Sequence, residues 1–164
     1  MKVTTAKIEA AKDAAMKALA GRDLTRAELL ELLVQRRHAP QAVEAALAEL
    51  EEVGIVDDRR VAIQYVERRI EEESPTRAIL DAELLERGVE SGLAATVLDE
   101  RSAGRDEGAD ALDLARDRVR RSKPDLTPEV IRRRVYAFLA KRGYDEDTCR
   151  QAVETAADEY LGRP

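Results

Sequence analysis

The sequence of 164 residues is poor in aromatic and sulfur-containing side chains, with no tryptophan, one phenylalanine, four tyrosines and one cysteine. The single cysteine, Cys149, cannot form an internal disulfide. One histidine, His38, beside one cysteine cannot supply a histidine-rich or cysteine-rich metal site. Walker, dinucleotide-binding and nucleophile-elbow patterns are also missing. We therefore expect a protein that is not an enzyme and that needs no cofactor and no metal.

Long apolar runs are absent as well. No window approaches the roughly 18 uncharged apolar residues that a membrane-spanning helix requires. The first twenty residues carry spaced lysines and do not resemble a signal peptide. We expect a cytoplasmic protein that does not interact with membranes.

Alternating apolar patterns joined by tight turns, the signal of a sheet, are scarce. Hydrophobic residues make up 44% and charged residues 38% of the chain, and alanine, leucine, glutamate and arginine dominate. This composition is typical of a helical protein.

The formal net charge of -6 argues against a protein that coats nucleic acid nonspecifically, because neutralisation of phosphates is the main source of such affinity. The charge is unevenly distributed, however. Residues 116–142 contain ten basic side chains and three acidic ones. The acidic total therefore hides a basic segment.

Three stretches of the sequence share one layout, which is a capped helix, a short turn and a second helix. They begin at residues 24–30, 74–77 and 127–129. Apolar residues at helical spacing predict another amphipathic helix before each pair, at residues 6–20, 57–73 and 108–121. The sequence thus repeats a unit of three helices every 50 to 55 residues.

The ends of the expected helices carry residues with a local structural role. Ser74 and Thr127 can cap free amides at a helix start, and each is followed by a proline that suits the first helical turn. Gly88 and Gly143 suit the left-handed residue that follows a helix end. His38 takes the place of this glycine in the first repeat.

Each three-helix unit is small, so we expect its core to be completed by packing against the next unit. The sequence predicts an all-α protein of three tandem three-helix repeats, at residues 1–56, 57–104 and 105–164. Residues 102–108 are expected to link the second and third repeats. Such repeats form an elongated, curved array, which offers a long surface for binding, and we expect a monomer.

Three motifs occur in order along the chain, at residues 19–29, 53–66 and 135–144. The first contains the basic and acidic pair Arg22 and Asp23 at the end of a helix. In order and spacing the motifs resemble the RecX family of recombinase regulators. They are similar to its opening motif, to the junction between its first two repeats, and to the end of the second helix of its last repeat.

The resemblance implies a bacterial modulator of the RecA recombinase that lies in the groove of the RecA filament on single-stranded DNA. Such a protein limits strand exchange and filament growth, and so acts in homologous recombination, DNA repair and the SOS response. Two features depart from the family pattern. Residues 71–75 begin with three glutamates where relatives have basic residues and a glycine, and Val61 stands where an aromatic is usual. The acidic run argues against direct DNA contact by the second repeat and leaves contact with a basic protein surface open.

The basic segment is the candidate site for a partner protein or DNA. Three consecutive arginines fan across about 200° of a helix, and a solvated charged face is the alternative interpretation. Basic residues on the preceding helix could extend them into one patch for phosphate or for an acidic filament surface, with single-stranded DNA contacted through the third repeat. The predicted residues are Arg116, Arg118, Arg120, Arg121, Arg132, Arg133, Arg134, Lys141 and Arg142, with Arg60 and Arg69 in the second repeat.

Other residues are assigned structural roles. Thr25 and Glu28 have the spacing of a capping box. Asp57 and Asp58 stand at the start of a helix and can cap it or complement its dipole. The aromatic residues, Tyr144 among them, are expected in the core or between repeats and not as exposed platforms for bases. The structural motif residues are Arg22, Asp23, Thr25, Glu28, Asp57, Asp58, Tyr65, Tyr136, Phe138 and Gly143.

Two other functions stay open at this point. Capped helix pairs can imitate the helix-turn-helix motif, so a DNA-binding protein of that type is one alternative, although the acidic net charge weighs against it. Binding to random duplex DNA without a recombinase would favour it. The second alternative is a helical-repeat adaptor unrelated to DNA, which would have no affinity for a recombinase filament.

Overall fold

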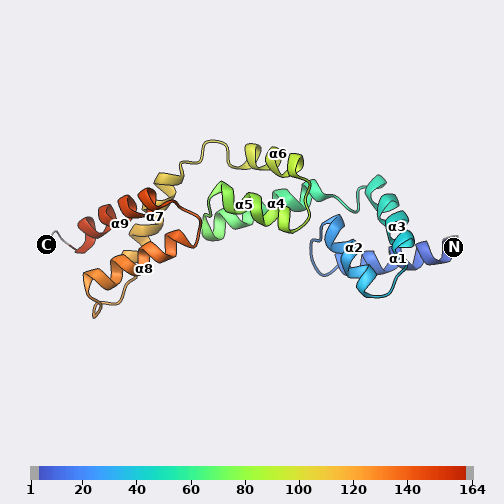
Figure 1. Ribbon diagram of the computed structural model, residues 1–164, viewed down its shortest axis with the longest axis horizontal. Coiled ribbons are helices and arrows are strands. Elements are labelled where there is room, and N and C mark those ends of the chain that lie inside the picture. The colour runs from blue at the N-terminus through green and yellow to red at the C-terminus, as the bar shows by residue number, and fades with distance from the viewer. Residues whose placement is uncertain (1–3, 162–164) are drawn as a thin grey trace. The chain divides into compact units, whose positions relative to one another are not determined.

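The computed structural model describes residues 4–161, and all regular secondary structure within this range is helical. Three helices fall within each of the three predicted repeats (Figure 1). The prediction of an all-α protein built from three-helix repeats is confirmed. The helices are α1 (Thr5–Leu19), α2 (Arg26–Gln35) and α3 (Pro40–Glu52), then α4 (Asp58–Glu73), α5 (Arg77–Glu86) and α6 (Ser91–Arg101), then α7 (Glu107–Arg120), α8 (Pro128–Ala140) and α9 (Glu146–Leu161).

By their contacts the described residues form two compact units. The first contains the described residues up to Glu67 together with Asp81–Arg101, and the second contains Arg68–Leu80 together with the described residues from Ser102 onward. The boundary passes through α4 and α5. The second repeat therefore contributes to both units.

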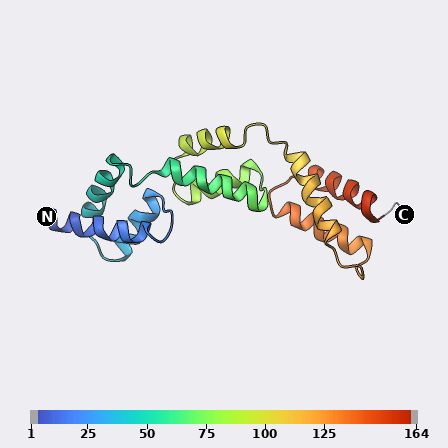
Figure 2. The same ribbon diagram turned by 180° about the vertical axis from the view of Figure 1, so that it is seen from behind.

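The first and third repeats each enclose a core between their three helices. In the third repeat α7, α8 and α9 pack against one another, as both views show (Figures 1 and 2). The helices that open these repeats bury alanines, and these small side chains allow neighbouring helices to approach closely. Larger aliphatic residues from the other two helices fill the space between them. The core of the first repeat includes Ala11, Ala15, Leu29, Leu33, Val43 and Leu47, and that of the third includes Ala111, Ala115, Ile131, Val135, Leu139 and Val153.

Within the first unit, the end of α5 docks on the start of α2. The hydroxyl of Thr25 donates to the carbonyl oxygen of Arg87 at 2.6 Å. The next residue, Gly88, has a φ of +77°, and a Cβ at Gly88 would lie 2.3 Å from the Cβ of Ala27. Only a residue without a side chain fits this contact, and we call the arrangement the first joint.

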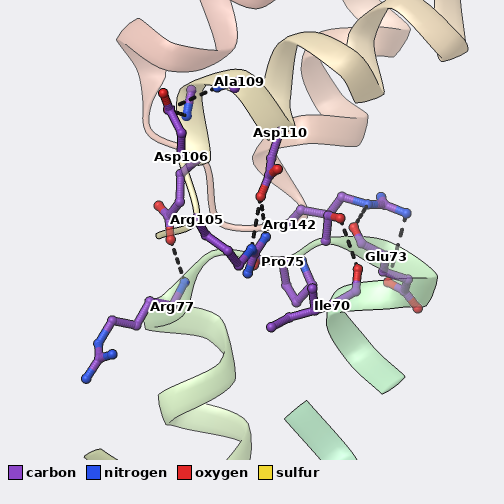
Figure 3. Close-up of polar contacts among 12 residues, drawn as sticks. Ile70, Glu73, Pro75, Arg77, Arg105, Asp106, Ala109, Asp110 and Arg142 are labelled. Atoms are coloured by element: carbon purple, nitrogen blue, oxygen red, sulfur yellow. Dashed lines mark hydrogen bonds and ion pairs between the residues drawn. The ribbon is translucent and has the colours of Figure 1, made fainter. Parts of the chain in front are cut away.

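A second joint of the same kind lies within the second unit (Figure 3). The end of α8 docks on the start of α5, where the amide of Thr76 donates to the carbonyl oxygen of Arg142 at 3.0 Å. A Cβ at Gly143, whose φ is +89°, would lie 2.4 Å from Cγ1 of Ile79. The two joints use the same residue types, a threonine and an Arg-Gly pair, but the threonine donates through its hydroxyl in the first joint and through its amide in the second.

Each joint is completed by an acidic residue from the first turn of a neighbouring helix. Asp58, at the start of α4, accepts a hydrogen bond from the amide of Arg26 at 2.7 Å. Glu107, at the start of α7, accepts one from the amide of Arg77 at 2.7 Å. The free amides at the start of α2 and α5 are thus satisfied by the repeat that follows.

Three details of the expected helix ends are wrong. Thr127 occupies the N-cap position of α8, but its side chain makes no capping hydrogen bond. Ser74 does not cap α5, because its amide donates to the carbonyl oxygen of Ile70 at 3.1 Å and it completes the last turn of α4. The helix α5 begins at Arg77, after Thr76. In the first repeat, the left-handed residue is Arg37, with a φ of +66°, and not His38. The predicted positive φ of Gly88 and Gly143 is confirmed.

The steric demand of the first joint can be measured by Gly88→Ala. Alanine at a positive φ costs roughly 1–2 kcal/mol, and the collision with Ala27 should add to that cost. Gly54→Ala is the matched control, because Gly54 has a φ of +74° but no atom within 4 Å of its added Cβ. Urea denaturation should show the larger loss for Gly88→Ala. Equal losses would mean that the close contact with Ala27 has no energetic weight.

Candidate partner-binding surface

The ten basic residues of the segment 116–142 lie on α7, on α8 and in the turns that follow these helices. They do not form one uniform patch. Some are engaged by contacts within the protein, and most of the others line two separate hollows on the third repeat.

Three of the predicted residues hold the fold together. Arg116 binds Glu159 of α9 through two hydrogen bonds, of 2.9 Å from Nε and 2.7 Å from Nη2. These bonds are the largest cause of the lowered pKa of Glu159. Arg120 lies over the ring of Tyr160, 5.4 Å from its centroid. Both arginines therefore connect α7 to α9, while the third, Arg142, belongs to the second joint.

Arg142 is anchored on three sides. Its Nε donates to the carbonyl oxygen of Glu73 at 2.9 Å and its Nη1 to that of Phe138 at 3.1 Å. Its guanidinium carbon lies 3.6 Å from the centre of the Phe138 ring. Arg118 of α7 lies over the same ring at 4.9 Å. Phe138 thus links the joint to a basic residue of α7 by cation–π contacts.

One hollow, which we call the α7–α8 pocket, has a volume of about 160 Å³. It contains no acidic residue in its lining. Arg121 forms an exposed ion pair with Asp117 at 3.0 Å. The side chains of Lys123 and Arg134 form no hydrogen bond or ion pair with the residues that the structure describes. The lining residues are Arg118, Arg121, Ser122, Lys123, Leu126 and Arg134.

The second hollow, which we call the Tyr136 face, has a volume of about 270 Å³ and lies between α8 and α9. Tyr136 is 36% exposed, so the expectation that it packs in the core is wrong. The positions that face the core are held by Val135 and Leu139, and Tyr136 is turned away from them. Arg150 pairs with Asp147 at the rim. The lining residues are Arg132, Arg133, Tyr136, Arg150, Val153 and Glu154.

The remaining predicted basic residues are not in either hollow. Lys141 is exposed at the end of α8. Arg60 lies in the first unit, where its Nη2 donates to the carbonyl oxygen of Ile55 at 3.2 Å. Arg69 lies in the second unit, and its Nη1 is 2.9 Å from Oε1 of Glu73.

The predicted capping box is present at the start of α2. The hydroxyl of Thr25 accepts from the amide of Glu28 at 3.1 Å, and Glu28 accepts from the amide of Thr25 at 2.8 Å. Asp57 caps α4 as expected, by accepting from the amide of Arg60 at 3.0 Å. Asp58 does not cap its own helix, because its carboxylate is committed to the first joint.

The other aromatic residues connect elements of the fold. Tyr65 donates to Glu83 at 3.1 Å and its ring lies under Arg87, 4.9 Å away. Tyr144 is 5% exposed, and its hydroxyl donates to the carbonyl oxygen of Ser74 at 2.6 Å. Burial raises the pKa of Tyr144 to about 12, which keeps this hydroxyl protonated as a donor.

Several functional residues were not predicted from the sequence. Arg87 binds Glu28 with both Nε and Nη2, at 2.9 and 2.8 Å. Arg105 binds Asp110 at 2.6 Å and the carbonyl oxygen of Pro75 at 3.1 Å (Figure 3). The signal for Arg87 is the Arg-Gly pair that recurs at residues 87–88 and 142–143. Lys123 and Arg150 carried no signal beyond their charge.

The described residues contain no group of three or more side chains that could hold a metal ion. Among these residues there is also no helix that is both long and apolar enough to cross a membrane. The third repeat instead presents arginine and lysine at two hollows, one of which has an exposed aromatic ring. These features make the third repeat the candidate surface for a partner.

The fold defines the class of the protein, which is that of all-helical proteins built from three-helix repeats. Within it, residues 106–153 match the family model described as RecX, third three-helix domain. The chain is 35% identical over 160 residues to Regulatory protein RecX of Mycobacterium tuberculosis, covering 94% of this chain and 91% of that protein. It is 30% identical over 142 residues to Regulatory protein RecX of Chlorobium phaeobacteroides, covering 87% and 90%. The protein belongs to the RecX family.

The fold agrees with solved structures. The crystal structure of RecX from Lactobacillus salivarius superposes with a TM-score of 0.69 at 16% sequence identity. The likeness covers 93% of this chain and 98% of that one. The architecture is therefore retained although few residues are shared with that protein.

The Arg87–Glu28 pair should make stability depend on pH. Burial disfavours the charged carboxylate, but hydrogen bonds from Arg87 and from the Thr25 amide outweigh it and lower the pKa of Glu28 below 4.5. The carboxylate therefore stabilises the folded protein above about pH 4.5, and this contribution is lost as the pH falls through the lower, folded-state pKa.

The test is Glu28→Gln, with the exposed Glu31→Gln of the same helix as control. At pH 7 we expect Glu28→Gln to lower the free energy of unfolding by about 1 kcal/mol. Urea titrations from pH 7 to pH 3 should show this difference closing as the pH falls. A difference that is constant with pH, or equal for the two variants, would contradict the assignment.

Proposed function

We propose that this protein regulates the RecA recombinase by binding the RecA nucleoprotein filament, and that it limits strand exchange and filament growth. The observation that carries the proposal is the similarity to proteins named Regulatory protein RecX, which extends over 94% of the chain. Binding, not catalysis, is the activity that the surface of the third repeat supports.

The chemistry of the third repeat suits a partner that contains both protein and nucleic acid. The Tyr136 face combines an exposed tyrosine with arginines above a buried valine, Val153. Tyrosine and arginine are enriched among the residues that dominate protein–protein binding energy. We assign this face to contact with the recombinase protein, with acidic groups as the favoured counterpart of its arginines.

The acidic residues of α4 have a different role from the basic segment. Glu71, Glu72 and Glu73 are all exposed, and Glu73 also pairs with Arg69 at 2.9 Å and supplies its carbonyl oxygen to Arg142. Acidic side chains repel the DNA backbone. Their position supports contact of the second repeat with protein and not with DNA.

The proposed regulation can be tested with purified components. Adding the protein to RecA filaments on single-stranded DNA should slow ATP hydrolysis and strand exchange, with an effect below one molecule per RecA protomer. Both rates would be followed during titration, together with filament length by electron microscopy. If all three are unchanged at a large excess of the protein, the proposed function is wrong even though the family is established.

The Tyr136 face can be tested by the double variant Arg133→Ala and Tyr136→Ala. Its affinity for the filament should fall roughly ten- to thirty-fold, which is the effect of removing one dominant interaction. The matched control removes the other exposed tyrosine of the third repeat and its arginine, Tyr160 and Arg120. Similar losses in both variants would show that the Tyr136 face has no special role.

A further inference from the structure

The α7–α8 pocket is a concentration of positive charge that the protein itself neutralises only in part, through the exposed ion pair of Arg121 with Asp117. Four basic side chains line it, and no acidic residue is among the lining residues. Lys123 and Arg134 have no hydrogen bond or ion pair within the described part of the chain. Like charges gathered in this way repel one another, so an anion bound between them would remove an unfavourable term as well as add favourable contacts.

The wall of the pocket is fixed before any ligand arrives. Arg118 lies over the Phe138 ring, and the same ring contacts Arg142, which is anchored on the carbonyl oxygen of Glu73. The turn that carries the other side chains is fixed as well. The hydroxyl of Ser122 donates to the carbonyl oxygen of Arg118 at 2.9 Å. The amide of Ser122 donates to the carbonyl oxygen of Val119 at 3.0 Å.

The lining also distinguishes the kind of anion. Leu126 is the one aliphatic side chain among the six lining residues, whereas four of them are basic. Guanidinium groups bind phosphate oxygens through paired hydrogen bonds, and lysine adds a point charge. A volume of about 160 Å³ limits the occupant to a small group. This chemistry fits a phosphate better than an acidic peptide.

We propose that the α7–α8 pocket binds a backbone phosphate of single-stranded DNA. Nucleic acid as the source of the phosphate rests on the proposed function, because the filament is the nucleic-acid partner that the family suggests. Arg118 and Arg134 bind the phosphate oxygens from two helices, and Lys123 contributes charge from the turn. The pocket and the Tyr136 face lie on different sides of α8, because residues 134 and 136 are about 200° apart around the helix. One repeat thereby presents separate sites to DNA and to protein.

The test compares two double variants that each remove two positive charges. Lys123→Ala with Arg134→Ala alters the pocket, and Arg132→Ala with Arg133→Ala alters the Tyr136 face. The probe is a fluorescein-labelled oligothymidylate, and its anisotropy is measured with the full-length protein alone, without RecA. Circular dichroism and thermal melting of both variants would establish that they fold like the parent.

The pocket variant should bind the oligonucleotide at least about ten-fold more weakly, since it lacks two charge-assisted hydrogen-bond donors. The slope of log affinity against log salt should also become shallower by about 0.7 for each phosphate that the variant no longer neutralises. The variant of the Tyr136 face should bind less than about three-fold more weakly, as expected for charges that act only at a distance. Equal losses of affinity in the two variants, or no loss in the pocket variant, would overturn the proposal.

Inorganic phosphate tests the source of the ligand. Oligothymidylate should bind the parent protein far more tightly than inorganic phosphate does at the same concentration of phosphate groups. Equal affinity would overturn nucleic acid as the ligand of the pocket. The proposed function is tested separately by the effect of the protein on RecA filaments. If the protein binds the oligonucleotide through the pocket but leaves RecA filaments unaffected, the proposed regulation is wrong and the phosphate site stands.

Discussion

The joint between successive repeats is the interaction on which the rest of the structure depends. A threonine at the start of one helix donates a hydrogen bond to the carbonyl oxygen of an arginine at the end of a helix of the next repeat. In the first joint the hydroxyl of Thr25 donates at 2.6 Å, and in the second the amide of Thr76 donates at 3.0 Å. The glycine after that arginine leaves room for the side chain of Ala27 in the first joint and for that of Ile79 in the second, where a Cβ would collide. A three-helix unit of about 50 residues has a small core and is only marginally stable alone. The joint supplies each repeat with contacts that its own core lacks.

The second joint also determines the geometry of the candidate surface. Arg142 connects the second joint to the candidate surface, because it is anchored on the carbonyl oxygen of Glu73 and stacks on the ring of Phe138. Phe138 in turn positions Arg118 at the α7–α8 pocket. An arginine that the sequence suggested as a ligand for a partner is therefore a structural residue. Its effect on binding is exerted through the side chain that it orients.

The first and third repeats differ from the joints at the corresponding positions. Arg37 holds the left-handed position that Gly88 and Gly143 hold in the joints, and its side chain would not fit the contact that those glycines make. Pro128 holds the first helical position of α8, where Arg26 and Arg77 donate an amide to a following repeat. Proline has no amide hydrogen to donate. At these positions the first and third repeats therefore do not have the residues that form the two joints.

The sequence by itself determined the helices, their grouping in threes and most of their ends. These features depend on local chemistry, since apolar spacing, prolines and glycines act within a few residues of where they stand. The errors at Ser74 and His38 were shifts of one or two residues at helix ends, where neighbouring residues compete for the same role. The resemblance carried by residues 19–29, 53–66 and 135–144 led to the correct family.

Tertiary structure decided which charged residues are available to a partner. Arg116 and Arg134 belong to the same basic segment. Arg116 is hydrogen-bonded to Glu159 of α9, whereas Arg134 pairs with no acidic residue in the described part of the chain. Asp57 and Asp58 are adjacent and chemically equal, yet one caps α4 and the other caps α2. The partners that make these differences, Glu159 for Arg116 and Arg26 for Asp58, are 43 and 32 positions away in the sequence. A charge pattern along one helix carries no information about partners that only folding brings within hydrogen-bonding distance.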